Sequence, residues 1–191
     1  MKTLTLLVSF IGGLVLFSCQ TKPIYDEPIK ELDSLKIVIQ QALVNFKTID
    51  SATCYNAQHK QSTYLHFLET HLKDTISKQD AEQIQQFQSL KSGFDTYVKY
   101  RSNWIQRAQQ SIHQLQTLTN DLKNGSVNHT EAVSYINEEK TNAFQAIEVL
   151  KTNTDNMRKH IELYNQYLPA YESIIKKLNA GALPQLITTN S

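Results

Sequence analysis

The feature that most constrains the fold is a hydrophobic repeat in the C-terminal third of the sequence. Residues recur there at alternating intervals of three and four without a slip. All but Lys140 and Thr154 are apolar or aromatic: Val133, Ile136, Lys140, Ala143, Ile147, Leu150, Thr154, Met157, Ile161, Tyr164, Leu168, Tyr171, Ile175 and Leu178. Such a long heptad repeat is typical of a helix packed in a coiled-coil-like bundle. It predicts one helix over 130–179, roughly 70 Å long at about 1.5 Å per residue.

The ends of this predicted helix carry suitable capping residues. Asn128 followed by Glu131 is similar to a capping box at the start. Gly181 is suited to the left-handed conformation that ends many helices. Pro169 lies inside the repeat and has no amide hydrogen to donate, so we expect a kink at this position and not a break.

A second repeat precedes the first and predicts a helix over 80–123. Ser77 followed by Asp80 is suited to cap its start, and Asn124 with Gly125 is suited to end it. Polar residues interrupt this repeat at a few positions, and its apolar members are Ile84, Phe87, Phe94, Val98, Ile105, Ala108, Ile112, Leu115 and Leu122.

A third repeat starts after Pro28 and changes register near Asp50. The first part is formed by Leu32, Leu35, Ile39, Ala42, Phe46 and Ile49, and the second by Cys54, Ala57, Gln61, Leu65, Leu68 and Leu72. This shift is similar to a coiled-coil stutter. Either one helix covers 28–73 with a local unwinding, or two helices meet near Asp50–Thr53. The absence of Gly and Pro from Ile29 to Ser92 favours one helix.

Together these repeats predict an all-α fold. Short connections force consecutive helices to be antiparallel. We therefore expect an elongated antiparallel three-helix bundle with heptad packing over 28–180, similar in outline to spectrin-type repeats. Residues 181–191 are expected to form a flexible tail.

The first residues of the sequence are of a different kind. Lys2 precedes an uncharged apolar run from Leu4 to Phe17, which is short for a membrane span and leads into Leu16-Phe17-Ser18-Cys19. This segment resembles a bacterial lipoprotein signal peptide with a lipobox. The resemblance implies cleavage after residues 1–18 and attachment of lipid, including palmitate, to Cys19.

The same resemblance implies a location in the cell envelope. Residues 19–27 would then be the lipidated cysteine and a short tether to the membrane. Gln20, and not Asp, follows Cys19, which by resemblance to Gram-negative lipoproteins favours the outer membrane over other sites in contact with the periplasm.

Charge and cysteine content narrow the classes of partner. Removing Lys2 from 19 basic and 18 acidic residues leaves 18 of each, so the mature chain has no net charge to attract nucleic acid. With Cys19 lipidated, Cys54 has no partner for an intramolecular disulfide. We interpret Cys54 as a small buried hydrophobic residue.

No sequence motif indicates catalysis, a cofactor or a metal. The six histidines form no H-x-x-x-H pair, and E-x-x-H, C-x-x-C-H, G-x-S-x-G, Walker A and G-x-G-x-x-G are all absent. We therefore predict a protein that is not an enzyme. A possible interface is formed by Tyr164, Tyr167 and Tyr171 around Pro169, and by Trp104. Ordinary core positions are the favoured interpretation of Tyr164 and Tyr171.

These observations favour a lipid-anchored, non-enzymatic envelope protein whose bundle binds a protein partner or acts as a spacer. One alternative is a periplasmic bundle that binds a small ligand or metal through polar groups inside the seam, for which Lys140, Thr154 and Arg101 are the candidates. Another is an inhibitor or immunity-type lipoprotein. The sequence leaves the partner's identity and the oligomeric state open.

Overall fold

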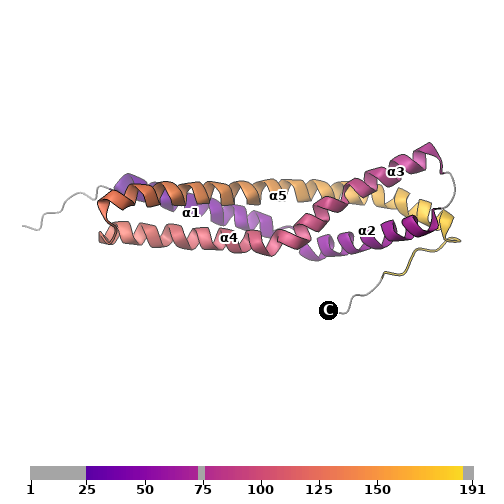
Figure 1. The fold of residues 1–191 in the computed structure, drawn as a ribbon, viewed down its shortest axis with the longest axis horizontal. Coiled ribbons are helices and arrows are strands. Elements are labelled where there is room, and N and C mark those ends of the chain that lie inside the picture. The colour runs from indigo at the N-terminus through magenta and orange to yellow at the C-terminus, as the bar shows by residue number, and fades with distance from the viewer. Residues whose placement is uncertain (1–24, 73–75, 187–191) are drawn as a thin grey trace, which may run out of the picture.

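The computed structural model describes residues 25–72 and 76–186, and regular secondary structure in this part of the chain is entirely helical. The helices lie along one axis and form an elongated rod (Figure 1). They are α1 (Asp26–Lys47), α2 (Ser51–His71), α3 (Lys78–Ser89), α4 (Lys91–Asn124) and α5 (His129–Leu178). The prediction of an all-α bundle is confirmed. The predicted signal peptide, Cys19 and residues 187–191 lie outside the described residues.

The predicted number of three helices is wrong. The helix expected over 28–73 is two helices, α1 and α2. Helices α3 and α4 meet at Leu90, whose backbone remains helical with φ −80° and ψ −16°, so they form one bent rod. With α5, this gives four packed rods. Because α1 and α2 follow one another along the axis, any level of the bundle still contains about three helices (Figure 1).

The two halves of the rod, one after the other along its axis, are formed by different helices. In what we call the α1 section, α1 packs against α4 and α5. In the α2 section, α2 and α3 pack with the start of α4 and the end of α5. Helix α5 runs through both sections without interruption (Figure 1).

The break between α1 and α2 is explained by the change of register in the sequence. A continuous helix that kept the α1 register would turn Thr53 and Asn56 toward the core. Instead Asp50 adopts an extended conformation, with φ −66° and ψ 106°. Its Oδ1 atom accepts the amide N–H of Ala52 at 3.0 Å, and its Oδ2 atom accepts the Thr53 hydroxyl at 2.6 Å. Asp50 thus caps the start of a new helix with a shifted register, in which Cys54 is fully buried.

Substitution of Asp50 tests this cap. Asp50→Ala is expected to lower the melting midpoint by a few degrees, because the start of α2 loses its side-chain acceptor. The hydrogen bonds from Thr53 and Ala52 lower the pKa of Asp50. The stabilising effect is therefore present above the pKa of the unfolded carboxyl and is lost as pH falls through the lower pKa of the folded one.

Thermal melts of the full-length chain, followed by circular dichroism between acid and neutral pH, measure this effect. Asp50→Asn is the matched control, because asparagine caps helices as well as aspartate does. It should keep the neutral-pH midpoint and show a smaller loss in acid. A wild-type midpoint in Asp50→Ala would contradict the assignment of Asp50 as the cap.

A buried amide lies at the bend between α3 and α4. Gln61 of α2 is fully buried, and its Nε2 atom donates to the backbone carbonyl of Phe87. The Leu90 amide also donates to this carbonyl, at 3.3 Å. The last turn of α3 is thus tied to α2 where the helix direction changes. Gly93 follows the bend and lies so close to His160 of α5 that an added Cβ would be 2.2 Å from its ring.

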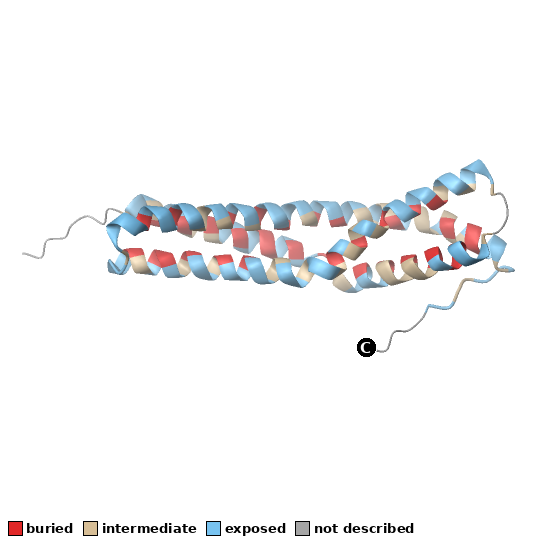
Figure 2. Cartoon of the chain, in the orientation of Figure 1, coloured by how far each residue is buried: buried red, intermediate tan, exposed pale blue. Residues whose placement is uncertain are grey.

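The heptad seams form the core, and buried residues face inward along every helix (Figure 2). The seam of α5 is displaced at its ends, where Val133 is 57% and Leu178 is 39% exposed, while Ala132 and Ile174 are buried. A straight helix with 3.6 residues per turn drifts from a strict seven-residue repeat, which accounts for the shift from Val133 to Ala132 at the start of α5. Helix α5 continues through Pro169, as expected. Helix α4 ends at Asn124 and is capped by Gly125, which has φ 67°, as predicted.

Candidate functional site

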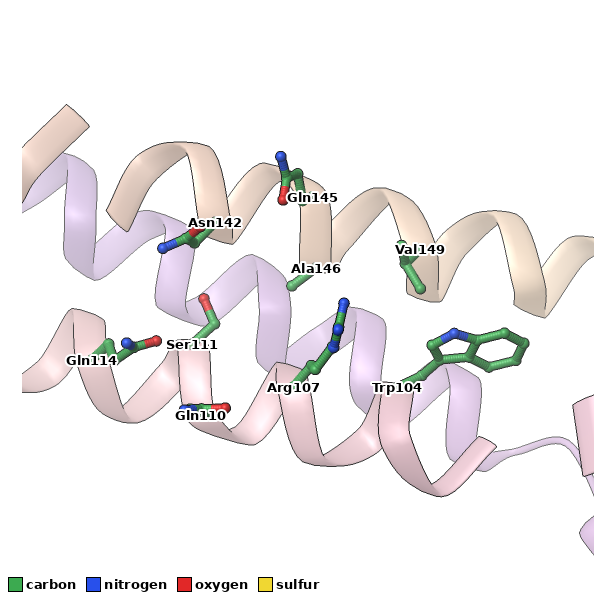
Figure 3. A pocket seen from close by; sticks show the side chains of 9 residues that line it. All are labelled: Trp104, Arg107, Gln110, Ser111, Gln114, Asn142, Gln145, Ala146 and Val149. Atoms are coloured by element: carbon green, nitrogen blue, oxygen red, sulfur yellow. The ribbon is translucent and has the colours of Figure 1, made fainter. Parts of the chain in front are cut away.

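The strongest candidate for a site is a groove between α4 and α5 in the α1 section, with a volume of about 310 Å³ (Figure 3). Helix α4 contributes Trp104, Arg107, Gln110, Ser111 and Gln114. Helix α5 contributes Asn142, Gln145, Ala146 and Val149. The volume lies at the lower end of the range of small-molecule sites. The groove follows from antiparallel packing, because the residues beside each seam line the channel between the two helices.

Ser111 lies at the base of this groove. The residue is 4% exposed, and its hydroxyl has no hydrogen-bond partner within the protein. A helical serine commonly bonds to a carbonyl one turn earlier, but no such bond is present here. The side chain points from α4 toward Asn142 on α5 (Figure 3). An unpartnered buried hydroxyl costs about 1–3 kcal/mol, so the fold alone does not favour serine at this position.

Trp104 closes one end of the groove, across from Val149 (Figure 3). Its indole is held from two sides. The ring of Phe46 in α1 meets it edge to face, with centroids 6.0 Å apart, and the ring of Tyr100 lies 6.2 Å away on the same helix. Trp104 is half-buried, so part of its surface remains accessible. The indole is therefore fixed before any partner arrives.

A second hollow of about 400 Å³ continues along the same two helices and shares Gln114 with the first. Its lining includes His113, Asp121 and Glu139. Partial burial, together with the charge of Glu138, raises the pKa of Glu139. Acidic groups therefore belong to the second hollow, whereas Arg107 is the one charged residue that lines the first.

The aromatic residues predicted as an interface do not come together. Trp104 lies in the α1 section, while Tyr164, Tyr167 and Tyr171 lie toward the other end of α5. Tyr164 and Tyr171 are 7% and 0% exposed and pack in the core against Phe87, at 5.6 and 4.0 Å between centroids. Their interface assignment is corrected, because neither ring is accessible to a partner. Tyr167 is half-buried against the same core.

The polar seam residues do not converge on a cavity. The Lys140 ammonium lies 2.6 Å from the Glu31 carboxylate of α1. The Thr154 hydroxyl donates to the Leu150 carbonyl at 2.7 Å, and Arg101 Nε donates to the Tyr97 hydroxyl at 3.0 Å. Each of these three side chains thus has a polar partner in the bundle, and none of them lines the two hollows described above.

The described ranges also contain potential metal ligands and one free thiol. Across 25–72 and 76–186, no three His, Cys, Asp or Glu side chains are grouped so that they can hold a metal ion. Cys54 is fully buried, and burial raises the pKa of its thiol to about 11, which disfavours the reactive thiolate. In the same ranges, no helix combines the length and apolar character needed to cross a membrane.

Trp104 is the only residue of this groove that is among the site residues predicted from the sequence. Gln110 and Gln114 are one turn apart on α4, and Asn142 and Gln145 are three residues apart on α5, so each pair lies on one helix face. Carboxamides at such spacing are common on solvated faces. The available signal was Ser111, a small polar residue next to the core position Ile112 of the predicted seam.

Comparison of the chain with protein-family models, with curated proteins and with solved structures found no match.

Proposed function

We propose that the chain is a bacterial lipoprotein, anchored in the cell envelope through lipid on Cys19, whose helical rod is a non-enzymatic protein-binding or spacer module. The observation that carries this proposal is the sequence Leu16-Phe17-Ser18-Cys19 at the end of an apolar, signal-like segment. By resemblance, Gln20 after the cysteine favours the outer membrane.

The position of α1 supports an anchored rod. Helix α1 begins at Asp26, seven residues after Cys19, at one end of the bundle (Figure 1). Seven residues reach at most about 25 Å. The Tyr25 hydroxyl lies 2.5 Å from His129 Nδ1, which ties the start of α1 to the start of α5. A lipid on Cys19 would therefore hold one end of the rod near the membrane, and the 50 residues of α5 extend about 75 Å away from that end.

Lipidation is tested by replacing each of the two cysteines in turn. In cells supplied with labelled palmitate, the wild-type chain is expected to take up label and to fractionate with the outer membrane. Cys19→Ala should take up no label and leave the membrane fraction, because the lipid is attached to Cys19 alone. Density-gradient fractionation separates inner from outer membrane.

Cys54→Ala is the matched control. It removes a buried thiol and leaves Cys19 in place, so it should label and fractionate as the wild type does. Membrane retention of Cys19→Ala would show that the lipid-anchor proposal is wrong. If Cys19→Ala took up label and Cys54→Ala did not, the lipid would be attached to Cys54 and the assignment to Cys19 would be wrong.

The role of the rod is tested by co-purification from a detergent extract. Recovery of an envelope assembly component would support a protein-binding module, and recovery of a toxin or cell-wall hydrolase would favour an inhibitor or immunity role. Melting curves with a panel of metals test the remaining alternative. A shift above about one degree with one metal would favour a metal-binding bundle.

A further inference from the structure

We propose that the groove between α4 and α5 binds a neutral oligosaccharide, with one sugar ring on Trp104 and hydroxyl groups along the carboxamides. The inference goes beyond the proposed function and does not depend on lipidation. It rests on the chemistry that lines the groove, on the fixed indole and on the unpartnered hydroxyl of Ser111 (Figure 3).

The groups along the groove match a ligand that both donates and accepts hydrogen bonds. Two carboxamides come from α4, at Gln110 and Gln114, and two come from α5, at Asn142 and Gln145. Each carboxamide offers two donor hydrogens and an acceptor oxygen. Sugar hydroxyls have the same dual character, and several of them project along an oligosaccharide at regular intervals. Amides on both walls therefore suit a chain of hydroxyl-bearing rings.

Trp104 supplies the apolar contact that such a ligand needs. One face of a pyranose ring presents C–H groups, which pack against a flat aromatic surface, while the hydroxyls point outward to polar partners. Phe46 and Tyr100 hold the indole in place. Less conformational freedom is then lost on binding, which favours affinity.

Ser111 is the second, independent observation. Its Oγ atom is buried, unpartnered and directed into the groove toward Asn142 (Figure 3). A ligand hydroxyl reaching the base of the groove would give this atom the hydrogen bond that the protein does not provide. Alanine would suit the fold alone better at this position, so a hydrogen bond to a bound ligand gives the serine a role that the fold does not.

Other ligand classes fit the groove less well. A docked helix requires apolar residues at successive turns on both walls, but Arg107, Gln110 and Gln114 follow Trp104 along α4. A polyanion requires several basic groups, and Arg107 is the one cation in the lining. The absence of carboxylates from this hollow equally disfavours a cationic ligand. A neutral, hydroxyl-rich chain remains.

The test uses the single tryptophan of the sequence as a reporter. The full-length chain, in a detergent without a sugar headgroup, is applied to a printed array of neutral and acidic bacterial and plant oligosaccharides. Each retained glycan is then titrated while tryptophan fluorescence is recorded. We expect at least one neutral glycan to be retained and to change the Trp104 emission in a saturable way that is insensitive to salt.

Variants show whether binding uses the groove. Gln114→Ala and Ser111→Ala are each expected to weaken binding about fivefold or more, through loss of one hydrogen bond. Gln109→Ala is the matched control, since Gln109 is exposed on the same helix and lies outside the groove. It should bind as the wild type does. Ser111→Ala should also melt at the wild-type temperature or above, which distinguishes lost binding from lost folding.

Three results would overturn the proposal: no neutral glycan is retained, retained glycans leave Trp104 emission unchanged, or Gln114→Ala and Gln109→Ala bind equally well. A preference for acidic glycans that disappears with added salt would identify an electrostatic surface instead. Cys19→Ala is expected to bind the same glycans as the wild type. The outcome for the groove is thereby separate from the outcome for the lipid anchor.

Discussion

Tyr171→Ala is expected to lower the free energy of unfolding by about 4 kcal/mol, within the range for removing a large aromatic side chain from a core. Tyr171 is fully buried. Its ring stacks on Phe87 of α3, with centroids 4.0 Å apart and planes inclined by 24°, and faces Tyr64 of α2 at 6.3 Å. One side chain of α5 thus joins both neighbouring helices of the α2 section, and alanine would leave a cavity between them.

Tyr171→Phe is the control for this prediction. The Tyr171 hydroxyl has no hydrogen-bond partner in the protein, so phenylalanine keeps the packing and removes a buried unsatisfied group. We expect Tyr171→Phe to be as stable as the wild type or more stable. Urea unfolding followed by circular dichroism measures both variants. A loss below about 1 kcal/mol in Tyr171→Ala would contradict the assignment of Tyr171 to the core and restore it as an interface residue.

The seams could be predicted from the sequence because apolar spacing directly reports which helix face is buried. Spacing alone predicts that Leu32, Ile39 and Phe46 lie in the core, and all three are fully buried. Spacing also predicts the shifted register from Cys54 to Leu68. What spacing could not decide was whether the backbone unwinds or breaks there, because that depends on Asp50 accepting hydrogen bonds from the next turn.

The candidate groove was harder to predict because it depends on contacts between helices. Within one helix, polar residues have the same spacing whether they lie on a solvated face or on the wall of a groove. The two settings differ only in which residue of the neighbouring helix lies opposite, as Asn142 lies opposite Ser111 (Figure 3). The absence of a hydrogen-bond partner for Ser111 is likewise a property of the packed structure.

Phe46→Ala is expected to cost about 4 kcal/mol in the α1 section, similar to the effect of Tyr171→Ala in the α2 section. Phe46 is fully buried in the last turns of α1. Its ring contacts Tyr97 and Trp104 of α4, with centroid distances of 5.8 and 6.0 Å. Alanine would therefore also free the indole, and we expect the native emission of Trp104 to shift to longer wavelength. Phe46→Leu, which keeps much of the volume, should lose less stability.

The two core variants together show whether the rod unfolds as one unit. Helix α5 passes through both sections, and α3 continues into α4 through Leu90, so opening one section would expose the seam of the other. Tyr171→Ala should therefore lower the urea midpoint reported by Trp104 fluorescence, although Trp104 lies in the α1 section. Fluorescence and circular dichroism midpoints should coincide in both variants. If the Trp104 midpoint stayed at the wild-type value while circular dichroism showed an earlier transition, the two sections would be independent folding units.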